Sequence, residues 1–224
     1  MNTQDFTLAG IALSALPSGA LWWPEERLLV VSDLHLGKSE RIARRSGTLL
    51  PPYESTETLS RLDADLAATD PAQVLCLGDS FDDLAASRAI PPAVRDRIAA
   101  AQSGRRWIWI EGNHDPGPLG LAGAHATEWL CGPLRFRHIA EEGPIAPGEV
   151  SGHYHPKYRL DLRGGRRVSR ACFLLDATRL ILPAYGAYTG GLHCHKAPLA
   201  TLMAADARAI LIGPQPCMVP MPRT

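Results

Sequence analysis

Four short polar segments, each placed directly after an apolar run, constrain the fold of this chain more than any other feature. The segments are Asp33-Leu-His35, Gly78-Asp79, Gly112-Asn113-His114-Asp115 and Gly152-His153-Tyr154-His155. A short apolar run that ends in a polar motif is typical of a strand buried on both faces. The sequence therefore predicts a sheet that brings aspartates, histidines and an asparagine to one edge.

The first half of the chain predicts alternating strands and helices. Strands are expected at residues 28–31, 73–77 and 106–110, and helices at 54–68 and 91–101. Another helix is expected to begin at Ser80-Phe-Asp-Asp83, which resembles a capping box. Before these elements, residues 6–23 predict one hairpin whose turn is Leu16-Pro-Ser-Gly19.

The second half predicts successive strands separated by turn residues. These strands are expected at residues 134–138, 149–151, 158–162, 167–175 and 179–182. No repeat or linker divides the chain, so we expect a single domain over residues 1–224. A two-layer sheet core flanked by helices is the simplest architecture for this pattern.

Composition narrows the class of protein. The 224 residues carry a formal net charge of zero, which removes any whole-molecule attraction to nucleic acid. The five cysteines are odd in number and lack CxxC spacing, which favours a reducing, cytoplasmic setting. No segment approaches the ~18 uninterrupted apolar residues of a membrane span, so we expect no membrane association.

Each motif taken alone allows a structural interpretation. Asp33 or Asp79 could cap a helix, since both follow a strand. His35 could be an ordinary surface histidine, Gly112-Asn113 a turn, and His138 a half-exposed strand residue. Four motifs in order are far less expected by chance than any one of them. If the backbone is extended, His35 points the same way as Asp33, and His155 the same way as His153.

The mixture of ligand types predicts the chemistry. Carboxylate, imidazole and amide ligands together suit Mn²⁺, Fe²⁺ or Zn²⁺, whereas structural zinc sites favour thiolates and calcium sites use oxygen alone. Two divalent ions about 3.5 to 4 Å apart can lower the pKa of a shared water and neutralise a leaving oxyanion. We therefore expect two divalent metal ions, with Mn²⁺ first, and phosphoester hydrolysis.

These residues resemble the signature of the calcineurin-like metallophosphoesterase superfamily, which reads D-x-H, G-D, G-N-H-(D/E), H and G-H-x-H. The resemblance implies an α/β, four-layer metallophosphoesterase fold, with two face-to-face mixed β-sheets flanked by α-helices. It implies one ion held by Asp33, His35, Asp79 and His155, and another held by Asp79, Asn113, His138 and His153. It also implies that His114 donates a proton to the leaving group or stabilises the transition state, oriented by Asp115.

A narrower resemblance spans most of the chain. Residues 32–40, 47–54, 78–83 and 182–191 resemble the ligase-associated DNA-damage-response phosphoesterases of bacteria. That family is named for endonucleases and is associated with a DNA ligase, an exonuclease and a helicase. The resemblance thus implies a role in the response to DNA damage and its repair, with DNA or a DNA-repair intermediate as the leading substrate and these three proteins as candidate partners. The alternatives are a small-molecule phosphodiesterase, a phosphatase, a nucleotide pyrophosphatase, or a non-catalytic scaffold of the same fold.

Three further segments bear on the substrate. Lys38, Arg41 and Arg45 would share one helical face and could contact flanking phosphates, or simply form a solvated basic face. The basic stretch from Arg163 to Arg170 is interpreted as a soluble turn. Residues 185–191 are either a substrate-side loop or a closing turn, and His193-Cys194-His195 is interpreted as an exposed tail.

Overall fold

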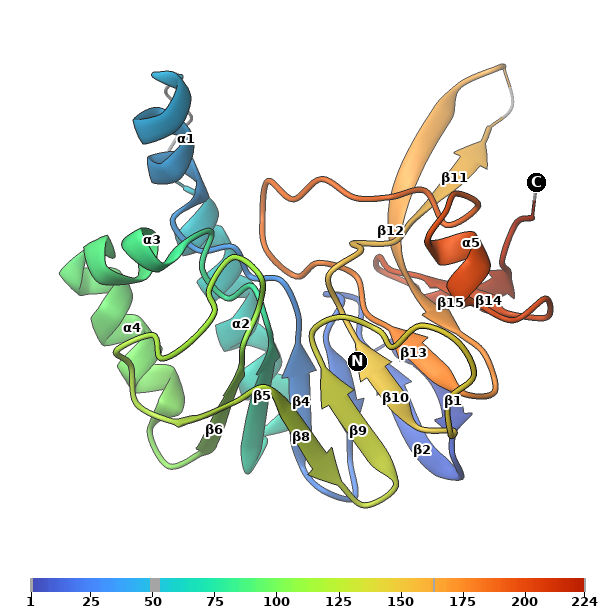
Figure 1. Cartoon of the computed structure of the whole chain (residues 1–224), viewed down its shortest axis with the longest axis horizontal. Coiled ribbons are helices and arrows are strands. Elements are labelled where there is room, and N and C mark those ends of the chain that lie inside the picture. Colours follow the sequence, from blue (N-terminus) through green and yellow to red (C-terminus); the bar gives the residue numbers. More distant parts are fainter. Residues whose placement is uncertain (1, 49–52, 163, 224) are drawn as a thin grey trace.

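Two β-sheets packed face to face form the body of the molecule, as the computed structural model shows (Figure 1). The structure describes residues 2–48, 53–162 and 164–223. Helices cover the outer face of the first sheet, and a short helix covers part of the second (Figure 1). Both sheets are mixed, as the four-layer α/β fold requires.

The first sheet follows the order of the chain. Its strands are β1 (Gln4–Leu8), β2 (Ile11–Ala15), β3 (Leu21–Trp23), β4 (Leu28–Val31), β5 (Gln73–Leu77), β6 (Arg106–Ile110) and β7 (Ala124–Ala126). The strands β1 to β4 pair antiparallel, and β4 to β7 pair parallel. The carboxyl ends of β4, β5 and β6 therefore meet at one edge.

The second sheet is built from the other half of the chain. Its strands are β8 (Glu128–Cys131), β9 (Leu134–Arg137), β10 (Glu149–Ser151), β11 (Lys157–Asp161), β12 (Arg167–Leu175), β13 (Arg179–Ile181), β14 (Arg208–Leu211) and β15 (Cys217–Pro220). Parallel pairing of β10 with β9 and with β13 aligns their carboxyl ends. The strand β11 pairs with β12 and lies off the main strand order of this sheet.

Alternating side chains divide the core into layers. The described helices are α1 (Lys38–Ser46), α2 (Glu54–Thr69), α3 (Leu84–Ala89), α4 (Pro92–Gln102) and α5 (Leu199–Leu202). On β6, Ile108 and Ile110 pack between the sheets, whereas Trp107 and Trp109 pack toward the helices. This period of two is the expected behaviour of a strand buried on both faces.

Two predicted details of local structure are wrong. The N-terminal region is not one hairpin, because a second turn at Ala9 and Gly10, both with positive φ, separates β1 from β2. The helix after β5 begins at Leu84 rather than at a box opened by Ser80, because the Asp83 carboxylate accepts the Ala86 amide. The remaining predicted strands and helices are present to within two residues, while β7, β8, β14 and β15 were not predicted. Residues 49–52 of the motif at 47–54 lie outside the described part.

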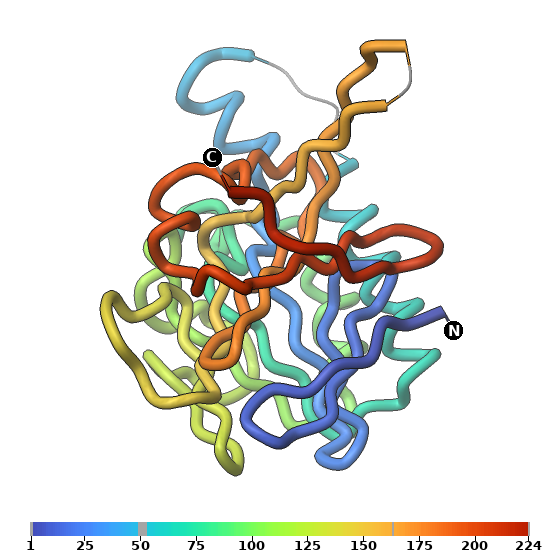
Figure 2. The backbone as a smooth tube through the Cα atoms, turned by 90° about the vertical axis from the view of Figure 1, so that its right-hand side faces the viewer, coloured from blue at the N-terminus to red at the C-terminus, as the bar shows by residue number. Residues whose placement is uncertain are grey.

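Two elements project from the same edge of the molecule. They are α1 and the hairpin of β11 and β12, and they rise apart from each other in two perpendicular views (Figures 1 and 2). None of the described helices has both the length and the apolar content to span a bilayer.

Candidate metal centre

Five strand ends bring the predicted ligands to one place. Asp33, Asp79 and Asn113 follow β4, β5 and β6 of the first sheet. His138 directly follows β9, and His153 lies two residues beyond β10 of the second sheet. The site therefore lies where the carboxyl edges of both sheets meet, and it needs residues from both halves of the chain.

One group of side chains surrounds the first position. Asp33, His35 and His155 have ligand atoms close enough together to bind one ion. Asp33 Oδ1 is 3.1 Å from His155 Nε2, and His35 Nε2 is 3.4 Å from the same nitrogen. Asp33 is fully buried.

A second group lies beside it and shares Asp79. Asp79, His138 and His153 form another set whose ligand atoms could bind one ion. His138 Nε2 is 3.3 Å from Asp79 Oδ2 and 3.1 Å from Asn113 Oδ1. Asp79 Oδ2 is also 4.0 Å from His35 Nε2 of the first group. The structure thus brings together all seven predicted ligands and places Asp79 between the two groups.

The backbone at these residues is not extended. Asp33, His35, Asp79, His153 and His155 all have φ between 46° and 71°. The expected extended backbone is therefore wrong. Asp33 and His35 still belong to one group, whereas His153 and His155 join different groups. Left-handed backbone at a non-glycine residue costs about 1–3 kcal/mol and is concentrated at functional sites. Five such residues in one centre indicate a geometry kept for binding.

Glycines make room for this arrangement. A Cβ at Gly78 would collide with the His138 ring, and one at Gly112 would collide with Asp79. A Cβ at Gly152 would collide with the Ser32 hydroxyl and lie 2.6 Å from Asp33 Oδ2. The glycines of these three motifs are therefore required by close packing against a ligand or, at Gly152, also against the residue beside one.

Asp82 is a member of the centre that the sequence interpretation missed. Its fully buried carboxylate is 2.8 Å from His35 Nδ1, so it can accept that ring N–H and leave Nε2 free to bind an ion. Arg41 donates to its other oxygen at 2.7 Å. In the sequence, Asp82 lies three residues after Asp79, inside the segment Ser80–Asp83 that resembles a capping box.

His114 is oriented by Asp82 and not by Asp115, which corrects the expected pairing. His114 Nδ1 is 2.9 Å from the Asp82 carbonyl oxygen, and its Nε2 is 4.0 Å from Asp79 Oδ2. The buried Asp115 carboxylate instead accepts the amides of Phe81 and Gly112 at 3.0 and 3.1 Å. Asp115 therefore holds the loops after β5 and β6 together, and His114 keeps a partly exposed Nε2 beside the shared aspartate.

The charged groups of the centre favour the binding of a cation. Burial alone would raise the pKa of Asp33, but the hydrogen bond and charge of His155 outweigh it and lower the pKa to about 2. Burial would likewise lower the pKa of His138, whereas Asp79 and Asp33 raise it to about 9. The pKa of His153 is lowered by burial and by the neighbouring charge of His138. These groups fit a divalent cation, whose charge can replace the shared protons.

The three predicted substrate residues have different surroundings. Lys38 Nζ is 3.8 Å from Asp82 Oδ1, and Arg41 also binds that carboxylate, so both are already paired. Arg45 is exposed near the end of α1. Their contact with substrate stays a prediction.

The candidate segments at residues 185–191 and 193–195 are partly buried. Tyr185 is buried and donates to Asp65 Oδ2 at 2.8 Å, so it cannot stack on a base, whereas Tyr188 is 45% exposed. The segment at 193–195 is not an exposed tail, because Cys194 is buried and its amide donates to the Lys157 carbonyl. No metal-binding group includes these residues within the described part of the chain.

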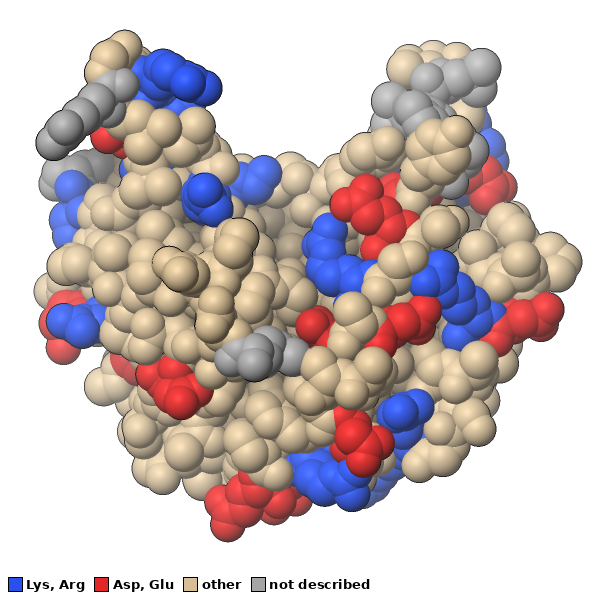
Figure 3. Space-filling view, turned by 180° about the vertical axis from the view of Figure 1, so that it is seen from behind, with Lys and Arg blue, Asp and Glu red and all other residues tan. Residues whose placement is uncertain are grey.

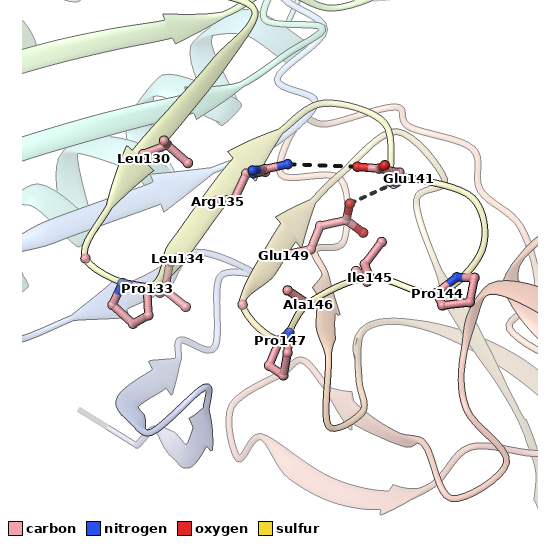
Figure 4. A pocket seen from close by; sticks show the side chains of 12 residues that line it. Leu130, Pro133, Leu134, Arg135, Glu141, Pro144, Ile145, Ala146, Pro147 and Glu149 are labelled. Atoms are coloured by element: carbon pink, nitrogen blue, oxygen red, sulfur yellow. Dashed lines mark hydrogen bonds and ion pairs between the residues drawn. The ribbon is translucent and has the colours of Figure 1, made fainter.

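Two cavities lie near β9. One of about 480 Å³ borders the centre and includes Asn113 and His138 in its lining. Another of about 340 Å³ is formed by the loop between β9 and β10, where Glu149 accepts the Glu141 amide and Arg135 faces Glu141 (Figure 4). Only the first contains residues of the metal centre, so it is the one adjacent to the chemistry.

Comparison with known proteins agrees with this geometry. The profile of the calcineurin-like phosphoesterase family matches residues 26–176. The crystal structure of the nuclease MPE of Pseudomonas putida shares 31% sequence identity, with 96% of this chain and 100% of that chain covered and a TM-score of 0.71. The phosphoesterase YfcE of E. coli shares 14% identity over 87% of this chain and 99% of its own, with a TM-score of 0.44. No curated protein sequence matches this chain.

Proposed function

Because the chain belongs to the calcineurin-like phosphoesterase family and is a metal-dependent phosphoesterase, we propose that it is a two-metal phosphodiesterase that acts as a DNA endonuclease. The observation that carries the two-metal proposal is the position of Asp79 between two groups of ligands. A carboxylate can bind two ions because its two oxygens bind independently. The similarity to a solved nuclease over nearly the whole chain supports a nucleic acid as the substrate.

The residues of the centre have separable tasks in such a reaction. Two bound divalent ions would supply a metal-activated water and neutralise charge on the phosphoryl group. Asp82 holds the ring of His35 through Nδ1 and the ring of His114 through its carbonyl oxygen. His114, with its Nε2 directed toward the shared aspartate, is placed to donate a proton to the leaving oxygen. Asp115 fixes the loops that carry Asp79 and His114.

The finer parts of the proposal come from the donor set, the cysteines and the sequence resemblance. The ions are Mn²⁺, with Fe²⁺ or Zn²⁺ as alternatives, because the donor set mixes carboxylate, imidazole and amide groups. The setting is cytoplasmic, which agrees with five free cysteines. The role is in the response to DNA damage, together with a DNA ligase, an exonuclease and a helicase.

A panel of substrates tests the function. The purified protein with Mn²⁺ is assayed on supercoiled plasmid, single-stranded DNA, RNA, cyclic nucleotides and a phosphomonoester, with His114→Ala as the control. We expect wild-type protein to nick the plasmid and His114→Ala to lose most of this activity, by a factor of about 10² or more. Cleavage confined to cyclic nucleotides or monoesters would replace the nuclease with a small-molecule phosphodiesterase or phosphatase. Full activity of His114→Ala would exclude the proton-donor role, and inactivity on every substrate would favour a scaffold.

A further inference from the structure

The two projecting elements begin at the metal centre itself. The helix α1 starts three residues after His35, and β11 starts two residues after His155. The Nε2 atoms of these two histidines are 3.4 Å apart. The bases of both projections therefore meet at the centre. A hollow separates the two projecting parts in the space-filling view (Figure 3).

The hairpin carries an excess of positive charge along a short stretch of chain. Between Lys157 and Ala171 the sequence has six basic residues and one acidic residue, in a chain whose net charge is zero. Arg159, Arg166 and Arg170 are exposed, and no carboxylate in the described part of the chain forms an ion pair with them. The acidic residue, Asp161, pairs with Arg167 at 3.2 Å where both side chains are more than 60% exposed. Such a pair adds little stability.

The charges of α1 are used differently. Lys38 and Arg41 pair with the buried Asp82, and Arg44 pairs with Asp83 at 3.0 Å. These three cations therefore stabilise the centre and the cap of α3. Only Arg45 of this helix is exposed without an ion-pair partner among the described residues. The predicted basic face of α1 is thus largely occupied, while the hairpin that the sequence interpretation discounted is not.

We propose that the hairpin of β11 and β12 is a phosphate-binding arm that holds the DNA backbone beside the metal centre, opposite α1. This inference rests on the proposed nuclease function and adds the surface that binds its substrate. A two-stranded hairpin without a core is marginally stable, and residues 164–167 at its far end are exposed. An extended basic ribbon of this kind matches a polyanion such as DNA through charge alone.

The composition of the hairpin argues against a protein partner. Protein interfaces have an apolar centre rich in aromatic side chains and depleted of charge. Among the described residues in the far half of the hairpin, the large apolar side chain that is exposed is that of Leu162, at 45%. Backbone phosphates, which are read without sequence preference, fit this surface better.

Binding measurements with a matched control test the proposal. The hairpin variant is Arg159→Ser/Arg166→Ser. The control is Arg135→Ser/Arg208→Ser, which removes two exposed arginines near the amino ends of β9 and β14. Both double variants and their parent carry His114→Ala. Each protein is titrated into a labelled DNA oligonucleotide in the presence of Mn²⁺. Each lost phosphate contact lowers the slope of log affinity against log salt by ~1, so the hairpin variant should lose about 2 and bind about tenfold more weakly or worse at low salt. The control should match the parent.

Catalysis separates this inference from the function on which it rests. With His114 intact, the hairpin variant should hydrolyse a small aryl phosphodiester at the wild-type rate, because the centre is unchanged, and should nick plasmid more slowly. Unchanged DNA affinity and salt slope in the hairpin variant, or equal losses in the control, would overturn the arm. If wild-type protein hydrolyses only small esters, the nuclease proposal fails whatever the hairpin does. Equal effects with RNA would assign the arm to nucleic acid backbones in general.

Discussion

At the scale of single residues, the centre is organised around two aspartates rather than one. Asp79 lies between the two ligand groups, while Asp82 holds His35 and His114 from behind. The ligands could be predicted from their motifs because their spacing is local. The role of Asp82 could not, because its partners lie 47 and 32 residues away and only the fold brings them together.

Replacing Asp82 should weaken metal binding without removing a ligand. In Asp82→Asn, one oxygen that faces His35 or Arg41 is lost, so the orientation of the His35 ring is no longer fixed. We expect metal affinity to fall by about 10- to 100-fold, the usual effect of losing such a partner. Isothermal titration with Mn²⁺ measures it, and Asp83→Asn is the control because asparagine also caps helices well. Unchanged affinity in Asp82→Asn would show that this contact is dispensable.

Adding a single methyl group at Gly112 should disrupt the centre. A Cβ at this position would collide with Asp79 and lie 2.7 Å from Asp115 Oδ1. Overpacking of this kind costs about 1–3 kcal/mol, and here it also displaces a shared ligand. Gly112→Ala should therefore bind Mn²⁺ more weakly and unfold at lower denaturant concentration. Gly190→Ala is the control, since a Cβ added there would have no neighbour within 4 Å and the φ of Gly190 is not in the left-handed region. Equal metal affinity and stability of the two variants would contradict the steric argument.

At the scale of elements, the strands were predictable and their connections were not. Apolar runs define β4, β5 and β6 because both faces of each are buried. By contrast, Asp83 and Ser80 are both plausible caps in the sequence, and only the structure shows that the Asp83 carboxylate accepts the Ala86 amide. The missed strands β7 and β8 have no buried residue, so they lack the apolar signal.

The loop after β13 should depend on one buried hydrogen bond to α2. Tyr185 is fully buried and donates to Asp65, whose pKa is raised by burial. Tyr185→Phe leaves this carboxylate without its donor, and we expect a loss of about 1–3 kcal/mol in the free energy of unfolding. Urea denaturation measures the change, with Tyr188→Phe as a control on an exposed ring of the same loop. A loss of the same size in both variants would mean that the buried bond adds nothing.

The turn between β12 and β13 should make stability depend on pH. Burial would raise the pKa of Asp176, but hydrogen bonds from Ala204, Thr178 and Arg179 lower it below its usual 3.8. The pKa of Asp176 is thus lower in the folded protein than in the unfolded protein. Its ionised carboxylate therefore stabilises the fold at pH values above the pKa of the unfolded state, and this stabilisation is lost as the pH falls through the pKa of the folded state. Asp176→Asn loses an acceptor for one backbone amide, so we expect it to be about 1–2 kcal/mol less stable at pH 7. Denaturant melts should show this difference shrinking below pH 3.8; a constant difference would exclude the charge as its cause.

At the scale of the whole molecule, a net charge of zero conceals an uneven distribution. The sequence shows how many basic residues each segment has, but not which of them are paired. Only the structure shows that Lys38 and Arg41 neutralise a buried aspartate while the hairpin cations face solvent. The basic residues that matter for a polyanionic substrate could therefore not be chosen from sequence spacing.

The metal centre should also hold the two sheets together. Asp33, His35, Asp79 and Asn113 come from the first sheet, and His138, His153 and His155 come from the second. Bound ions would cross-link the two halves, and a ligand that binds only the folded state at about 100 times its Kd adds ~2.7 kcal/mol per independent site. We therefore expect chelation to lower the Tm and Mn²⁺ to restore it, measured by scanning calorimetry at pH 7. Asp79→Asn, which weakens the ligand shared by both groups, should show a much smaller response to Mn²⁺. An equal response in this variant would mean that the stabilising ion binds outside the centre.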